Sequence, residues 1–281
     1  LGATEPGVMA WQQLTALPGL GQAVWLSLFT GMAATGLSLL FAASFCAVMH
    51  GRMTPGRGAR LLTPFLAAPH AAIAIGLAFV LAPSGWIARA LALPFDWDRP
   101  PDLASVNDPW GLALVLGLMV KEVPFLLLVI LAAQTQIPVR AQMAAGRSLG
   151  YGPGLVWLKV VMPQVWPLIR LPVLVVLAYS LSTVDMALIL GPSNPPTLAV
   201  LLTRLFSDPD LDRLLPASAG GLVQLGLVLL SFILLWLAER MVAGLGVMWL
   251  RRGGRGSSAE PLLRVTTGLT LGLFLIGALA M

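Results

Sequence analysis

The chain has 281 residues, of which 58% are hydrophobic and only 10% are charged. A soluble domain usually carries about 25% charged residues, so this composition excludes a water-soluble globular protein and indicates a chain that lies in a lipid bilayer. The net charge of +5 does not indicate nucleic acid binding, because the arginines lie in loops between apolar segments, where a cytoplasmic membrane surface accounts for them.

Six apolar segments follow one another along the chain, and each is close to or above the length that crosses about 30 Å of hydrocarbon as a helix. Helix is expected because a lone strand would leave its backbone polar groups unpaired in lipid. The sequence therefore predicts an all-α, polytopic transmembrane bundle. The predicted spans are residues 23–49, 61–82, 110–133, 166–190, 222–247 and 262–281.

The loops between these spans carry charges of alternating sign. The loops after the first, third and fifth spans are rich in arginine, which places them in the cytoplasm, whereas the other two carry aspartates and are expected outside. The first span then runs inward, and we expect a further span before Leu1. The arginines are Arg52, Arg57, Arg60, Arg140, Arg147, Arg251, Arg252, Arg255 and Arg264, and the aspartates are Asp96, Asp98, Asp102, Asp108, Asp208, Asp210 and Asp212.

Charged residues also lie within two of the spans. Lys121 and Glu122 lie near the middle of the third span, just before Pro124, and Asp185 lies deep in the fourth. A charge at the bilayer centre costs at least about 2.5–3.5 kcal/mol, so each requires a partner or water. Two interpretations stay open: an ion pair of Lys121 with Glu122 or Asp185 that holds helices together, or a translocation path on which Glu122 and Asp185 meet a cationic substrate. Pro124 is a candidate kink at a gate on such a path.

Other polar side chains accompany these charges. His70 follows Pro69 in the second span and is expected to be a satisfied polar residue at a helix contact. Hydroxyls surround Asp185 in the fourth span and would share in either an ion-pair network or a substrate path. They belong to Tyr179, Ser180, Ser182 and Thr183.

The cytoplasmic loop at residues 137–167 reads IPVRAQMAAGRSLGYGPGLVWLKVVMPQVWP. Helix formers run from Val139 to Leu149, after which glycines interrupt the pattern. A second short helix is predicted from Leu155 to Met162, ended by Pro163. Two short helices at an angle predict a structured protrusion on the cytoplasmic face.

Ala144–Gly146, Gly150 and residues 160–163 follow a spaced pattern within this loop. They resemble the EAA loop of ABC importer permeases, which reads Glu-Ala-Ala, three residues, Gly, nine residues and Ile-x-Leu-Pro, and which docks into a groove on an ATPase subunit. We therefore name residues 137–167 the coupling loop. Ala144 departs from the family's glutamate, and Arg147, on the same helix face as Arg140 and Ala144, is expected to supply the polar contact. The coupling residues that the resemblance implies are Arg140, Ala144, Ala145, Gly146, Arg147, Gly150, Val160, Met162 and Pro163.

The resemblance covers residues 24–250 and implies a five-helix type I importer permease core within residues 1–250. More narrowly, the chain resembles the first half of fused two-half permeases of the putative thiamine and ferric-iron type. Residues 251–261 would then be a cytoplasmic linker, and residues 262–281 the first span of a second, truncated half. The implied function is import of a small solute, thiamine or another small cation, across a bacterial inner membrane.

No enzymatic activity, metal site or cofactor is expected of this chain. A phosphate-binding loop needs a lysine directly after glycine, and neither Lys121 nor Lys159 follows one, so ATP and Mg are expected on a separate ATPase subunit at the coupling loop. The other expected partners are a periplasmic substrate-binding protein, a second permease half and the lipid bilayer. A secondary, ion-coupled transporter that uses Glu122 and Asp185 as proton relays stays open as the alternative.

Overall fold

The computed structural model describes residues 8–50, 53–99, 102, 104–251, 253–256 and 259–281. Arg52 and Arg252, both predicted to be cytoplasmic, lie outside these residues. Within the described part, the chain forms helices joined by loops, and six helical segments are long and apolar enough to cross a membrane. The predicted all-α polytopic bundle is confirmed. The six segments are Leu20–Val48, His70–Phe95, Leu112–Gln136, Pro153–Ser182, Leu211–Arg251 and Glu260–Leu279.

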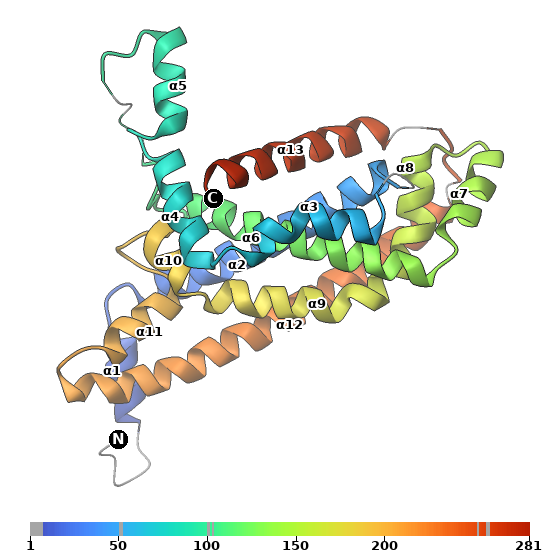
Figure 1. Ribbon diagram of the computed structural model, residues 1–281. Coiled ribbons are helices and arrows are strands. Elements are labelled where there is room, and N and C mark those ends of the chain that lie inside the picture. The colour runs from blue at the N-terminus through green and yellow to red at the C-terminus, as the bar shows by residue number, and fades with distance from the viewer. Residues whose placement is uncertain (1–7, 51–52, 100–101, 103, 252, 257–258) are drawn as a thin grey trace.

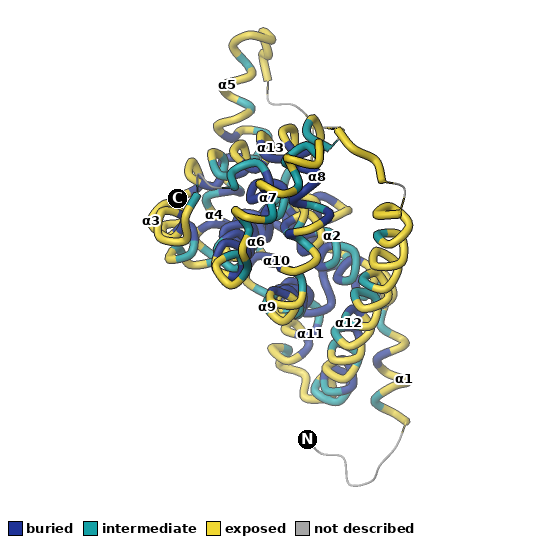
Figure 2. The backbone as a smooth tube through the Cα atoms, turned by 90° about the vertical axis from the view of Figure 1, so that its right-hand side faces the viewer, coloured by how far each residue is buried: buried dark blue, intermediate teal, exposed yellow. Residues whose placement is uncertain are grey.

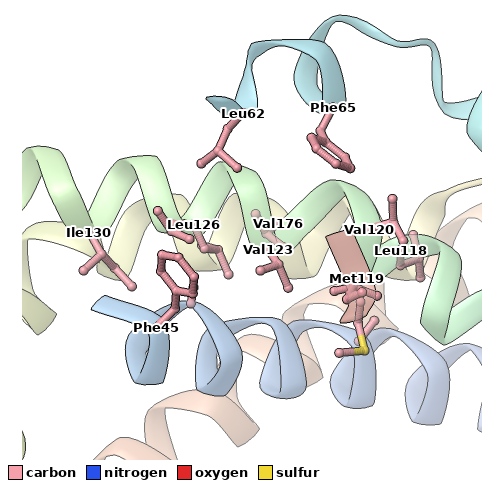
Figure 3. Packing of buried hydrophobic residues seen from close by; sticks show 14 of the residues in the cluster. Phe45, Leu62, Phe65, Leu118, Met119, Val120, Val123, Leu126, Ile130 and Val176 are labelled. Carbon is pink, nitrogen blue, oxygen red and sulfur yellow. The ribbon is translucent and has the colours of Figure 1, made fainter. Parts of the chain in front are cut away.

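Three helices form the centre of the bundle: α2 (Leu20–Val48), α6 (Leu112–Ala133) and α9 (Met162–Ser182), each of which packs against the other two (Figure 1). Most of α6 is buried, and its apolar side chains lie between Phe45 of α2 and Phe65 of the neighbouring chain segment (Figure 3). Lipid tails are as apolar as leucine side chains, so the hydrophobic effect does not drive helices together within a bilayer. Such contacts hold the helices together by close packing instead. The centre of the bundle is therefore an apolar core around α6.

Two predicted spans are interrupted in the structure. The second consists of α3 (Pro55–Ala67) and α4 (His70–Leu81), and the fourth consists of α9 and α10 (Asp185–Leu190). The first break has extended backbone at Ala68, since a residue before proline avoids the helical region. We name these interruptions, at 68–69 and 183–184, the helix breaks. The segments that follow them, α4 and α10, pack against each other.

Helices that the sequence did not indicate lie at one end of the bundle. Figure 1 shows α4 turning away from the long axis of the bundle, with α5 (Trp86–Phe95) standing clear of it. The carboxylate of Asp108 accepts hydrogen bonds from the backbone N–H groups of Leu112 and Ala113, at 2.8 and 2.9 Å, and so caps α6. The remaining short helices here are α1 (Met9–Thr15), α11 (Leu198–Phe206) and the turn η3 (Leu211–Arg213).

The last two spans differ in how they meet the core. The fifth, α12 (Leu214–Arg251), is longer than its predicted range and is largely exposed (Figure 2). The sixth, α13 (Glu260–Leu279), packs against α2, α4 and α6. The ring of Phe274 in α13 lies 5.3 Å from that of Phe65 and 6.3 Å from that of Phe45, measured between centroids. The sixth span is thus seated on the bundle that the earlier spans form.

The arginine-bearing loops gather at the opposite end, which we name the arginine-rich end. Figure 1 shows there the end of α2, the start of α3, the helices α7 and α8 of the coupling loop, the end of α12 and the start of α13. The aspartate-bearing loops lie at the other end. This grouping agrees with the orientation that the charge pattern predicts.

Candidate functional site

The first helix of the coupling loop is α7 (Val139–Ser148), preceded by the short turn η1 (Gln134–Gln136). Its predicted range is confirmed to within one residue. Gly150 lies two residues after the end of this helix, and its φ of +83° is in the left-handed region that residues other than glycine rarely adopt. The chain can therefore reverse directly after α7, and α8 (Pro153–Val156) packs back against it.

Gly146 lets α7 and α8 approach closely. A Cβ atom at this position would lie 2.5 Å from a methyl carbon of Val156, well inside van der Waals contact. On the same side of α7, Met143 is buried. Gly146 is therefore required by packing, and α7 is fixed against the rest of the loop.

The opposite side of α7 is open to solvent. Arg140, Ala144 and Arg147 are all exposed, as their spacing predicts for one helix face. Ala145 is also exposed, and Leu149 leaves 60% of its surface uncovered at the end of the helix. The structure thus brings these residues together as one exposed face at the arginine-rich end, which we name the α7 face.

The second half of the coupling loop differs from its prediction. The expected helix from Leu155 to Met162 does not stop at Pro163 but runs through a π-helical turn, η2 (Trp157–Val161), into α9. Pro163 lies in the first turn of α9, where a missing N–H costs little, and the wider π turn directly precedes it. Val160, in the π-helical turn, and Pro163, in the first turn of α9, are exposed, and Met162 at the start of α9 is partly buried, so these three coupling residues lie apart from α7.

Lys121 is buried in α6 and its side chain reaches the first helix break. The carbonyl groups at the end of a helix have no partners within that helix, and an ammonium group offers three donors. Among the described residues, Lys121 forms no ion pair, so the ion pair with Glu122 or Asp185, one of the two interpretations left open by the sequence, is absent. Its Nζ instead donates hydrogen bonds to the carbonyl oxygens of Phe65 at 2.8 Å, Leu66 at 3.1 Å and Ala68 at 2.8 Å.

Glu122 points away from this break, into the contact between α2, α6 and α9. The hydroxyl of Ser180 donates a hydrogen bond to its Oε1, and the hydroxyl of Thr35 donates to Ser180 at 3.5 Å. Ser38 lies beside the carboxyl group, but neither its hydroxyl nor Oε2 of Glu122 has a partner of ordinary hydrogen-bond geometry in the described part of the chain. Pro124 is buried two residues further along, and α6 continues through it as one helix. Both residues thus lie inside the core.

A second group of polar side chains lies between the two helix breaks and is partly exposed. The ring of His70, at the start of α4, lies 4.8 Å from the ring of Tyr179 in α9, at an angle of 44°. The hydroxyl of Thr183 donates to that of Tyr179 at 3.4 Å, and Asp185 is exposed at the start of α10. We name these four residues the polar face. Of the hydroxyls expected around Asp185, Ser180 is bonded to Glu122 instead, and Ser182 bonds the carbonyl of Ala178 in its own helix.

Gln224 was not singled out by the sequence analysis, yet it serves the second break. Its Nε2 donates a hydrogen bond to the carbonyl oxygen of Leu181, near the end of α9, at 3.0 Å. Lys121 of α6 and Gln224 of α12 therefore have the same role. Each donates hydrogen bonds to backbone carbonyl groups beside a break in another span. The signal in the sequence is that Gln224 is a lone amide side chain in an apolar span, which indicates a polar partner inside the bundle.

Comparison with known proteins gives one informative match. No protein-family model matches the chain. The chain is 35% identical over 271 residues to the inner membrane ABC transporter permease protein YnjC of Escherichia coli (strain K12). The match covers 94% of this chain and 49% of that protein, so the chain spans about half the length of its curated relative. The resemblance stated from the coupling-loop motif is confirmed.

Proposed function

We propose, on the premise that this multi-pass inner membrane protein is homologous to an ABC transporter permease, that the chain forms one half of the membrane-spanning part of an ABC importer. A separate ATPase subunit would dock on the α7 face and drive transport. A second permease half would complete the path, and a periplasmic binding protein would deliver the solute. The match to about half of a longer relative supports the two-half arrangement.

The α7 face is the observation that carries this proposal. A short helix held rigidly by the close contact of Gly146 with Val156, yet open on its other side, is suited to fill a groove on a partner. Its position at the arginine-rich end places it where a cytoplasmic ATPase would meet the permease. Arg140 and Arg147 supply positive charge to such a contact.

The polar face supports a small cation as the solute. Non-helical backbone and a carboxylate at membrane depth are tolerated where they line a water-filled cavity or are covered by protein. The ring of Tyr179, with Asp185 nearby, offers the aromatic surface and negative charge that organic cations such as thiamine bind. The second permease half would cover this face and close the cavity.

The alternative of an ion-coupled carrier has less support. Such a carrier would need Glu122 and Asp185 on one proton path, but Glu122 lies inside the core and Asp185 lies on an exposed surface. No hydrogen bond joins the Glu122 group to the polar face among the residues that the structure describes.

The docking claim is tested by reversing one charge on the α7 face. Arg147→Glu in the full-length protein should reduce co-purification of the ATPase subunit by about tenfold, since central interface residues often contribute that much. The matched control is Arg264→Glu, which reverses another exposed arginine near the same end, in α13. Equal retention of the ATPase subunit by both variants would refute docking at α7.

The solute claim is tested separately at the polar face. Asp185→Asn should lower transport of a cationic substrate by about tenfold or more, because a carboxylate that meets a cation is lost, while ATPase co-purification stays normal. Asp208→Asn, a partly exposed aspartate after α11, serves as the control. Unchanged transport by Asp185→Asn would show that this carboxylate does not meet the solute.

A further inference from the structure

Residues from beyond the coupling loop hold its second half in place. The backbone N–H of Gly152 donates a hydrogen bond to the carbonyl of Gly256 at 2.8 Å, and Tyr151 pairs with Gly256 as an isolated bridge. At the start of α8, the N–H of Gly154 donates to Oε1 of Glu260 at 2.8 Å. The coupling loop is thus joined by hydrogen bonds both to the linker between α12 and α13 and to the first residue of α13.

Lys159 adds a buried cation to the same contact. From the π-helical turn, its Nζ donates to the carbonyl of Gly254 at 3.1 Å. The ammonium also lies 4.7 Å from the ring centroid of Trp249 and 5.3 Å from that of Tyr151, within the range of cation–π attraction. Only 9% of Lys159 is exposed, and in the described part of the chain it forms no ion pair, so rings and a carbonyl stabilise its charge.

The contact at Glu260 is also tightly packed. A Cβ atom at Gly154 would lie 2.6 Å from a methyl carbon of Leu263, one turn into α13, so that α8 and α13 meet at close range. A carboxylate is well placed at the N-terminus of α8, where backbone N–H groups lack partners. The start of α13 is therefore fixed to α8, which in turn is fixed to α7 through Gly146.

The far end of α13 reaches the helices that carry the polar face. A Cβ atom at Gly76 of α4 would collide with the backbone of Ala280, directly after α13. Gly277, near the end of α13, lies against Phe65 at the end of α3. α13 therefore spans the distance from the coupling loop to the first helix break, with close packing at both ends (Figure 1).

We propose that Glu260 and Lys159 are positioning residues of the coupling loop, and that α13 is the element through which movement of α7 reaches α4 and the polar face. This inference rests on the proposed function, because it assumes that an ATPase subunit moves α7. Both side chains act through backbone groups and neighbouring rings, and neither belongs to the α7 face. Removing either side chain should therefore uncouple ATP hydrolysis from transport, while the ATPase subunit stays bound.

The first test measures transport per ATP hydrolysed by the full-length transporter in vesicles. Glu260→Ala removes the acceptor for Gly154 and should lower this ratio about fivefold or more, the usual size of coupling between distant sites, with normal ATPase co-purification. Glu260→Gln keeps an acceptor oxygen and should restore most of the ratio. Glu239→Ala, which breaks the ion pair of Glu239 with Arg170 away from the loop, should leave the ratio unchanged.

The second test needs no ATPase subunit. Spin labels at Ser148→Cys in α7 and Leu262→Cys in α13, both exposed positions, report the distance between the two helices. The distribution should be narrow with Glu260 in place, and should broaden with Glu260→Ala and with Lys159→Met. A distribution equally narrow in all three would overturn the positioning role. It would do so even if the proposed ATPase docking were correct.

The two tests also separate the two proposals. A full transport ratio with Glu260→Ala would overturn the route through α13, and loss of ATPase co-purification by this variant would show that Glu260 acts in docking instead. Failure of the unmodified protein to bind any ATPase subunit would refute the proposed function. The label distances would still decide whether Glu260 and Lys159 position the loop.

Discussion

The coupling loop and the helix breaks are both places where short helices meet, but different parts of the chain stabilise them. In the coupling loop, α7 and α8 pack through nearby residues, Gly146 and Val156, and Gly150 provides the turn. At the breaks, the free carbonyl groups of α3 and α9 are bonded by Lys121 and Gln224, which belong to other helices. The bilayer explains the difference, because lipid offers no hydrogen-bond partners to an interrupted backbone.

The largest effect on stability is expected from a substitution at the first helix break. Lys121→Met would leave three carbonyl groups, one buried and two partly buried, without their donor, and we expect a loss of about 3 kcal/mol or more in the free energy of unfolding. Lys121→Arg keeps a cation with several donors and should retain part of the stability. Thermal unfolding in detergent checks this, and an unchanged melting temperature for Lys121→Met would show that the cap is not needed.

A smaller and more local effect is expected in the coupling loop. Gly146→Leu would overpack the contact with Val156 at a cost of about 1–3 kcal/mol, which the loop can relieve by moving α7. ATPase co-purification should fall while the melting temperature of the bundle changes little. Gly36→Leu, in open space on α2, is the matched control. Comparable ATPase binding by the two variants would contradict the close-packing argument.

The second break should be less sensitive than the first, because its cap is a neutral amide. Gln224→Leu removes one hydrogen bond to the carbonyl of Leu181, which is expected to cost about 1 kcal/mol. The measurement is the same thermal unfolding series. A loss as large as that of Lys121→Met would mean that the two caps do not differ as their charge predicts.

The smallest effect is expected at the ion pair between Arg170 and Glu239, which joins α9 to α12 at 3.2 Å. Both side chains are partly exposed, so Arg170→Gln should cost less than about 1 kcal/mol. This variant sets the baseline of the series. A larger loss here would indicate that α12 is held to the bundle mainly by this pair.

The same contrast explains how far the sequence predicts the structure. The coupling loop was predictable because its signals are local: the helix formers from Val139, the glycine at position 150 and the exposed spacing of Arg140, Ala144 and Arg147. Its second half was predicted wrongly at Pro163, since a proline in the first turn of a helix and a proline that ends one look alike in sequence.

The helix breaks could not be located in this way. Pro69 marked the first, but apolar composition on both sides favoured one continuous span, and nothing at Thr183 and Val184 marked the second. The partners of Lys121 and Glu122 also depend on which helices lie beside α6. Neighbouring residues in a helix point in different directions, so Lys121 faces α3 while Glu122 faces Ser180 of α9.

The docking of an ATPase subunit on the α7 face is the central claim, and cross-linking in native membranes tests it most directly. A cysteine introduced by Ala144→Cys, on the exposed face, should form a cross-link to the ATPase subunit, whereas one introduced by Leu275→Cys, exposed within α13, should not, and the native Cys46 is buried. We expect this product in the full-length transporter. If Ala144→Cys reacts freely with a soluble maleimide yet gives no cross-link to the ATPase subunit, the claim is contradicted.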